Sequence, residues 1–191
     1  MRKSKQETAA TRQRIVASAA AEFRRNGIAG TGLADLMAAA GLTHGGFYKH
    51  FESKEQVVDE ALALAIESMV QEWQRTLSAS PGGRGLDNAI AGYLSAEYRD
   101  NVASGCPFVA LGGEVSRTSD VVRATATTGF LKLVDLIAGQ LEGLSPAAAR
   151  NEALFLLTSM IGAVTLARVV NDPNLSTTIL RQARKHLTPK E

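Results

Sequence analysis

Apolar residues recur at intervals of three and four along most of the chain, and polar residues fill the positions between them. This period places the apolar side chains on one face of an α-helix. No segment shows the two-residue alternation of a half-buried strand. The pattern therefore predicts an all-α fold of about nine helices. We expect the first helix from Thr8 or Thr11 to Asn26, and the others over about 31–41, 43–51, 54–78, 86–101, 105–116, 119–142, 146–171 and 174–187.

A short helix is predicted directly after a turn at Gly41 and Leu42. Phe47 and Phe51 are four residues apart, so both rings share one face and can anchor the helix. Thr43 stands at the N-cap position, where its hydroxyl can accept a hydrogen bond from a first-turn N–H group.

The opposite face of this short helix carries an imidazole, a phenol and an ammonium group, from His44, Tyr48 and Lys49. Gly45 and Gly46 lie beside them, and each glycine costs a helix roughly 1 kcal/mol relative to alanine. That cost indicates a surface that a large partner must approach closely. A helix N-terminus with basic and hydroxyl side chains also suits phosphate. We therefore expect this helix to lie in a groove of double-stranded DNA.

The preceding segment, residues 31–41, has the apolar spacing of a second short helix. Two short helices joined by a glycine-containing turn form a helix-turn-helix, in which the second helix reads DNA. An ordinary helical hairpin is the alternative. Across about residues 9–60 the sequence resembles the N-terminal DNA-binding domain of the TetR family of bacterial regulators. The resemblance is carried by Thr31, Asp35, Ala40-Gly41-Leu42, Gly45, Phe47-Tyr48, His50-Phe51 and Ser53-Lys54-Glu55.

This resemblance implies a homodimer that binds a near-palindromic operator and carries a helical body for a small-molecule effector. The chain departs from the family pattern at Gly32, where members often have a hydroxyl residue, and at Ala34, where many have a basic one. These small side chains shift the expected DNA contacts toward the second helix of the motif and the start of the next one. The residues that we expect at the DNA are Thr31, Thr43, His44, Gly45, Gly46, Tyr48, Lys49, His50 and Lys54.

Charge is divided unevenly along the chain. Residues 1–54 hold nine Lys and Arg against four Asp and Glu, a net charge of +5, whereas residues 55–191 have a net charge of −3. A basic head on a mildly acidic body suits a protein that presents one end to a polyanion. We accordingly expect a DNA-binding domain over 1–54 and a ligand-binding and dimerisation domain over 55–191.

Composition argues against several other classes of protein. No apolar run reaches the roughly 18 residues of a membrane span, and no apolar stretch follows the basic N-terminus, so we expect neither a membrane protein nor a secretory signal. The single cysteine fits a reducing cytoplasm. No hydrolase motif, nucleotide-binding loop or metal-ligand spacing occurs. We therefore expect no catalytic residues, no cofactor and no metal.

The helix predicted over 146–171 is apolar almost all round, so it must be buried on every side. Part of that burial can come from a second copy of the chain, with the last helix adding a second apolar strip. A purely intramolecular core is the alternative. In the TetR family the final two helices form a four-helix dimer interface, and this pattern is similar to it. The residues expected there are Phe155, Ser159, Gly162, Ala163, Leu166, Ile179 and Ala183.

The family resemblance also implies an effector pocket in the body, and a mainly apolar cavity is the usual form of such a site. Each candidate residue alone equally fits an ordinary core. Cys106 suits a buried apolar position or a reactive thiol, and Glu114 can pair with Arg117 on a helix face or serve as a polar group in the cavity. The candidates are Met69, Trp73, Tyr93, Tyr98, Cys106, Phe108, Glu114, Phe130 and Met160.

Together these features favour a cytoplasmic, ligand-responsive transcriptional repressor that a small, largely apolar effector releases from DNA. A constitutive DNA-binding regulator and a small-molecule-binding protein that retains the fold stay open as alternatives. We expect the effector to tilt the long helix over 54–78, because Met69 and Trp73 lie about four turns from its DNA end.

Overall fold

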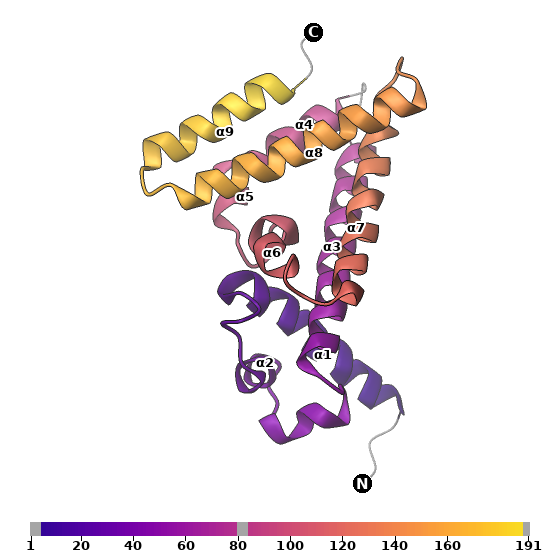
Figure 1. Cartoon of the computed structure of the whole chain (residues 1–191), viewed down its shortest axis with the longest axis vertical. Coiled ribbons are helices and arrows are strands. Elements are labelled where there is room, and N and C mark those ends of the chain that lie inside the picture. The colour runs from indigo at the N-terminus through magenta and orange to yellow at the C-terminus, as the bar shows by residue number, and fades with distance from the viewer. Residues whose placement is uncertain (1–4, 80–83, 189–191) are drawn as a thin grey trace.

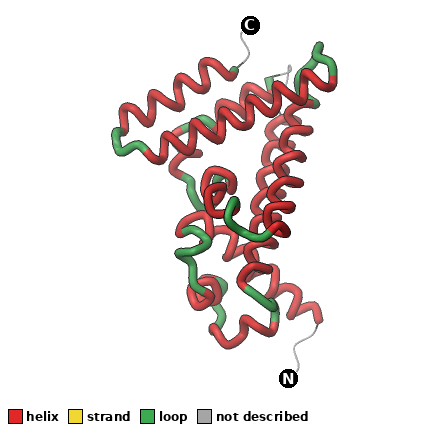
Figure 2. Tube along the Cα trace, in the orientation of Figure 1, coloured by secondary structure: helices red, strands yellow, loops and turns green. Residues whose placement is uncertain are grey.

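The computed structural model describes residues 5–79 and 84–188, which form helices joined by loops and turns, with no strand among them (Figure 2). The all-α prediction is confirmed. We call residues 5–53 the head and residues 54–188 the body. The elements are α1 (Lys5–Asn26), α2 (Leu33–Ala39), η1 (His44–Lys49), α3 (Lys54–Ala79), α4 (Gly85–Tyr93), α5 (Ala96–Asp100), α6 (Pro107–Val115), α7 (Asp120–Ala138), α8 (Pro146–Val169) and α9 (Pro173–Leu187).

The head is held together by apolar side chains that its three helices bury against one another. Ile15 and Phe23 of α1, Leu36 of α2 and Phe47 of η1 all lie in the hydrophobic core. Phe51 follows η1, and its ring centroid is 5.6 Å from that of Phe47. The predicted aromatic anchor is therefore confirmed, and it fixes which face of η1 turns outward.

The long helix α3 leaves the head and runs side by side with α7, while α8 and α9 cross the far end of the body (Figure 1). The contact between α3 and α7 is close because Gly129 has no side chain. A Cβ at Gly129 would lie only 2.5 Å from Cγ2 of Ile66. The described residues begin with α1 in the head and end after α9, at the opposite end of the molecule.

Several helix ends follow the sequence signals that predict them. The Ser145 hydroxyl accepts a hydrogen bond from the Ala148 N–H at 3.3 Å, and a proline follows it at the first helical position. Asp172 caps α9 in the same way, again before a proline. At the start of α3, the Gln56 N–H donates to the Ser53 hydroxyl at 3.2 Å. These caps explain why α3, α8 and α9 begin where they do.

Several helices differ from the sequence prediction in their bounds or their type. The first helix begins at Lys5, before Thr8. The single helix predicted over 86–101 is two helices, because the Ser95 hydroxyl accepts from the Tyr98 N–H at 3.0 Å and starts a new one. The segment that the sequence predicts to contact DNA is a six-residue 3-10 helix. Two glycines in six residues disfavour an α-helix, and 3-10 helices occur in such short pieces.

The helix α8 has two apolar sides. One side packs on α7 and α9 and buries Leu157, Met160 and Val164. Within residues 5–79 and 84–188, α8 is the one helix long and apolar enough to cross a membrane by length and composition alone, and 33% of its most apolar stretch is buried in the chain. The remaining apolar side faces outward.

Candidate functional site

The short helix η1 presents a polar face to solvent. Tyr48 is 69% exposed, and His44 and Lys49 are exposed beside it. A Cβ at Gly45 would meet no atom within 4 Å, so the protein's own packing does not require a glycine there. At Gly46, a Cβ would lie 3.4 Å from a side-chain atom of α2. The open space at Gly45 lies where the sequence predicts a close approach by DNA.

The turn before η1 sets its direction. Gly41 has a φ of +69°, a conformation that favours glycine. The Leu42 N–H donates to the Met37 carbonyl at 2.8 Å, which closes the end of α2. Thr43 stands at the N-cap with extended backbone, as predicted, but its hydroxyl makes no capping hydrogen bond. That part of the prediction is wrong, and the exposed Thr43 side chain lies on the outer surface.

The far end of η1 is fixed by Arg12 of α1, which the sequence analysis did not single out. Its Nε donates to the His50 carbonyl at 3.2 Å, and its guanidinium lies 4.5 Å from the centroid of the Phe51 ring. The same guanidinium forms an ion pair with Glu60 of α3. Arg12 thus joins three elements at the DNA-facing end. His50 itself is half-buried, unlike Lys49.

Two predicted DNA contacts are engaged inside the protein. Thr31 is 1% exposed, and its hydroxyl donates to the Gly27 carbonyl at 2.6 Å. The predicted contact of this side chain with DNA is therefore wrong, because Thr31 closes the loop between α1 and α2. The half-buried Lys54 donates from Nζ to the Ile28 carbonyl at 2.5 Å. An ammonium has three N–H donors, so two remain for another partner.

In the body, a cavity of about 200 Å³ lies between α3, α4 and α5. The ring centroids of Trp73 and Tyr93 are 6.1 Å apart, and those of Tyr93 and Tyr98 are 4.5 Å apart. A Cβ at Gly92 would meet no atom within 4 Å, so this position leaves the cavity open. An engineered cavity of about 150 Å³ holds benzene, so the volume suits a small, flat molecule. The structure thus brings together three of the predicted pocket residues.

The other predicted pocket residues do not line this cavity. Phe108 and Phe130 form a separate edge-to-face pair, with centroids 5.5 Å apart. Met69 and Met160 belong to the buried core. Cys106 has no exposed surface, and burial raises the pKa of its thiol, so the buried apolar interpretation of Cys106 is the one that fits.

Glu114 was predicted as a polar group of the pocket, and that prediction is wrong. Its Oε2 accepts a hydrogen bond from the Ala29 N–H at 2.8 Å, in the loop between α1 and α2. The Glu114 carboxylate therefore links α6 to the head through this hydrogen bond. No ion pair joins it to Arg117 within the described residues.

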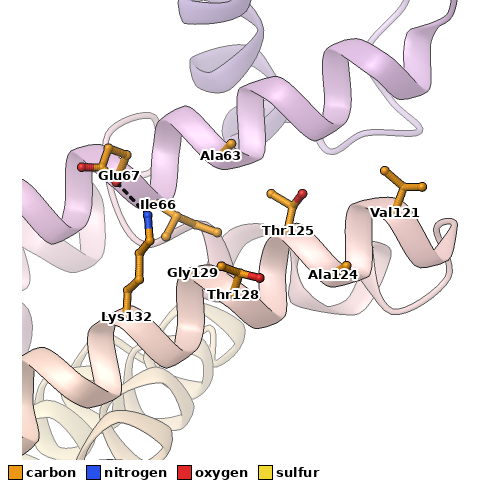
Figure 3. A pocket seen from close by; sticks show the side chains of 9 residues that line it. All are labelled: Ala63, Ile66, Glu67, Val121, Ala124, Thr125, Thr128, Gly129 and Lys132. Atoms are coloured by element: carbon orange, nitrogen blue, oxygen red, sulfur yellow. Dashed lines mark hydrogen bonds and ion pairs between the residues drawn. The ribbon is translucent and has the colours of Figure 1, made fainter.

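A larger groove of about 500 Å³ runs along the outer side of α3 and α7 (Figure 3). Small side chains such as Ala63 and Ala124 line it, with Thr125 and Thr128 between them. At one end Lys132 and Glu67 form an ion pair at 3.4 Å across the groove. None of the predicted pocket residues belongs to this groove.

The outward side of α8 is the second distinctive surface. Phe155, Leu166 and Val169 are 57%, 55% and 72% exposed. The half-buried Ser159 and Gly162 continue the same row, whose members are spaced by four, three, four and three residues. Ala163 of α8, and Ile179 and Ala183 of α9, are also half-buried. All seven residues predicted for the dimer interface thus retain exposed surface in the single chain.

Comparison with known proteins identifies the family of this chain. Residues 15–61 match bacterial regulatory proteins of the tetR family, and residues 63–186 match the C-terminal domain of LmrA/YxaF-like transcriptional regulators. The chain belongs to the TetR family. It is a transcriptional regulator with a DNA-binding helix-turn-helix, which η1 completes.

Two curated TetR-family relatives are similar over most of their length. A helix-turn-helix-type transcriptional regulator of Mycobacterium tuberculosis (strain H37Rv) is 29% identical over 92% of this chain and 93% of its own. The transcriptional repressor DhaR of Mycobacterium sp. (strain GP1) is 30% identical over 83% of this chain and 82% of its own.

Solved TetR-family structures share the whole fold. The reduced form of NemR from E. coli has a TM-score of 0.78 at 25% identity, covering 95% of this chain and 99% of its own. A TetR regulator from Chloroflexus aurantiacus has a TM-score of 0.79 at 29% identity, covering 96% and 94%. The order of head and body found here is therefore that of solved relatives.

Proposed function

We propose that this TetR-family regulator is a ligand-responsive repressor that binds a near-palindromic operator as a homodimer in the bacterial cytoplasm. One observation carries the proposal: the chain exposes a polar helix face on η1 at one end and an apolar row on α8 at the other. The polar face of η1 suits phosphates and base edges. The apolar row on α8 suits a second copy of the same chain.

Dimerisation follows from the apolar row. The row has large apolar side chains at both ends and the small residues Ser159 and Gly162 between them. On a helix already packed on its other side, such a row buries well against an identical helix related by a two-fold axis. A dimer also presents two reading helices, which suits an operator with two half-sites one helical turn apart. The similarity to the repressor DhaR supports repression as the outcome.

The effector site that we favour is the cavity with Trp73, Tyr93 and Tyr98 in its walls. Three aromatic side chains line it, and it lies against α3, the helix that begins at the head. A ligand wedged beside Trp73 would tilt α3 and change the separation of the two heads. Tenfold relief of repression requires the ligand to favour the released state by about 1.4 kcal/mol.

The test begins with sequence selection from random duplexes by the purified wild-type protein. We expect a two-fold symmetric motif and a mobility shift that saturates as a dimer on one duplex. A selected motif with no symmetry, or no enrichment at any salt concentration, would contradict the proposal.

A panel of small molecules then separates the ligand-responsive repressor from a constitutive binder and from a carrier that retains the fold. We expect an effector to raise the melting temperature, to change the fluorescence of Trp73, which is the only tryptophan, and to bind more weakly in the presence of operator. A molecule that binds equally well with and without operator is no effector, and a protein that binds ligands but no DNA is a carrier.

Two substitutions distinguish the aromatic cavity from the outer groove. Gly92→Leu fills the first, and Ala124→Leu occupies the second. We expect Gly92→Leu alone to abolish the ligand response while DNA binding is retained. The reverse result would move the effector site to the groove between α3 and α7.

A further inference from the structure

One peptide group in the head is held by two charged side chains from two other parts of the molecule. Lys54, the first residue of α3, donates from Nζ to the Ile28 carbonyl at 2.5 Å. Glu114, near the end of α6, accepts from the Ala29 N–H at 2.8 Å. The Ile28 carbonyl and the Ala29 N–H belong to the same amide. A cation therefore lies on its oxygen side and an anion on its hydrogen side.

The two charges act on this amide in the same direction. The ammonium draws electron density toward the carbonyl oxygen, and the carboxylate favours positive charge on the N–H. Charge-assisted hydrogen bonds are stronger than neutral ones, and bonds in a chain polarise one another. The arrangement Lys54, peptide, Glu114 is therefore one linked unit. Removal of the anion weakens the bond that holds the cation.

The loop is shaped around the Glu114 carboxylate. Gly27 has a φ of +79°, and a Cβ there would lie 2.5 Å from Oε1 of Glu114. The Thr31 hydroxyl bonds back to the Gly27 carbonyl and closes the loop. Glycine at position 27 suits this backbone conformation, and a larger residue there would displace the Glu114 carboxylate.

The other end of α6 lies against the aromatic cavity. Cys106 is the N-cap residue of α6, and its thiol lies beside the Tyr93 hydroxyl, whose ring forms one wall. Glu114 comes two turns later on the same helix. A displacement of the cavity wall would therefore reach Glu114 along α6, a helix of nine residues, without any tilt of α3.

We propose that Glu114 is a positioning residue for DNA binding. Through the Ile28–Ala29 peptide it holds Lys54 toward the DNA phosphates. The position of α6 thereby affects the affinity of the head for DNA. This proposal rests on the proposed function, in which Lys54 contacts phosphate. The bond to Ile28 uses one ammonium donor and leaves two for a phosphate oxygen. When α6 moves, the anion leaves the peptide and Lys54 loses its fixed position.

The test is a double-mutant cycle on duplex DNA selected by the wild-type protein. We expect Glu114→Ala to weaken binding roughly tenfold and to lower the magnitude of the log–log salt slope by about one per subunit, as the loss of one phosphate contact does. In a Lys54→Ala background, Glu114→Ala should change affinity less than twofold, because the two residues act as one unit.

Controls separate positioning from folding. Arg117→Ala, an exposed residue in the turn directly after α6, should leave affinity and salt slope unchanged. Arg24→Ala removes a different bond between head and body, from its Nε to the Ala103 carbonyl at 2.6 Å, and its effect should add to that of Lys54→Ala. Glu114→Gln keeps an acceptor without the charge and should fall between wild type and Glu114→Ala.

A second measurement does not depend on DNA. Hydrogen exchange at the Ala29 amide should accelerate in Glu114→Ala and, to a smaller extent, in Lys54→Ala. Additive effects of Glu114→Ala and Lys54→Ala on affinity, or unchanged exchange at Ala29 in both variants, would overturn the linked unit. A wild-type protein that binds no DNA would instead overturn the proposed function, and with it this role for Glu114.

Discussion

The reading face of η1 and the outer face of α8 are both the exposed sides of helices whose other sides are buried, yet they expose opposite chemistry. In η1 the Phe47 ring turns inward, and the side chains of His44, Tyr48 and Lys49 are exposed. In α8 the buried side is apolar and the exposed side carries Phe155, Leu166 and Val169 as well. A helix with one apolar side can bury that side against its own chain. A helix with two apolar sides needs a second partner to bury the side that its own chain leaves exposed. The side chains left bare therefore indicate what each end binds.

The largest effect should follow from a charge on the apolar row of α8. Leu166→Glu places a carboxylate where a second copy would bury it, so we expect monomers and a loss of operator affinity of at least about a thousandfold, since each head then binds alone. Sedimentation and mobility shifts measure both. Val121→Glu is the matched control, because Val121 is 67% exposed on α7 and lies outside the row. If the Leu166→Glu variant remains a dimer, the exposed apolar side of α8 is not the dimer interface.

Neighbouring residues of η1 should separate stability from binding. Phe47 has no exposed surface, and Phe47→Ala should lower the free energy of unfolding by about 3 to 4 kcal/mol through the lost packing and the cavity left behind. Tyr48→Ala should change it by less than about 0.5 kcal/mol, as surface substitutions usually do, and should weaken DNA binding. Denaturant unfolding and DNA titration test the pair. Equal stability losses would mean that η1 is not anchored as described.

A smaller effect is expected from the charged group of the reading face. Lys49→Ala should weaken operator binding about tenfold and lower the salt slope by about one per subunit. Titrations at several salt concentrations measure both quantities. Lys132→Ala removes a lysine of α7 that pairs with Glu67, and it should leave the slope unchanged. His44→Ala should instead alter the selected base sequence, since His44 begins η1.

The smallest effect concerns the cavity wall. The Tyr93 hydroxyl is buried and makes no hydrogen bond within the described part of the chain, although the Cys106 thiol, a weak acceptor, lies beside it. Tyr93→Phe should therefore leave the free energy of unfolding at pH 7 unchanged or raise it by up to about 1 kcal/mol. A clear loss of stability would reveal a hydrogen bond to this hydroxyl.

Tyr93→Phe should also change how stability depends on pH in the alkaline range. Burial raises the pKa of Tyr93 in the folded state, so the stabilisation by its bound proton is complete below the ordinary pKa of about 10 and is lost as the pH rises above it. Unfolding measured from pH 9 to pH 11 should show a steeper decline for wild type than for Tyr93→Phe.

Periodicity was enough to predict the features that depend on neighbours in the chain. The spacing of Phe47 and Phe51 and the all-round apolar character of α8 are local signals, and each matches the structure. The resemblance to the TetR family supplied the functional meaning of the helix-turn-helix. The boundary between α4 and α5 failed because Ser95 lies inside an otherwise regular helical pattern.

Contacts between distant residues carried no such signal. Glu114 lies 85 residues from Ala29, and Arg12 lies 48 from Glu60, so no period relates them. Thr31 matched a family position, but its burial depends on how the loop between α1 and α2 closes. Trp73, Tyr93 and Tyr98 came from three helices whose relative placement the sequence does not give. Polar side chains whose partners come from other helices are therefore the ones that sequence patterns misassign.

The missing side chain at Gly129 has a mechanical consequence. With Ile66 seated directly on the backbone of α7, the helices α3 and α7 share one contact surface and resist sliding past each other. A rotation of α3 then carries α7 with it as a single stiff rod. Since α7 also packs on α8, such a rotation displaces the helix that bears Phe155 and Leu166. In the proposed dimer, a rotation in one subunit would therefore move the interface helix of its partner. The DNA affinity of both heads would then change together.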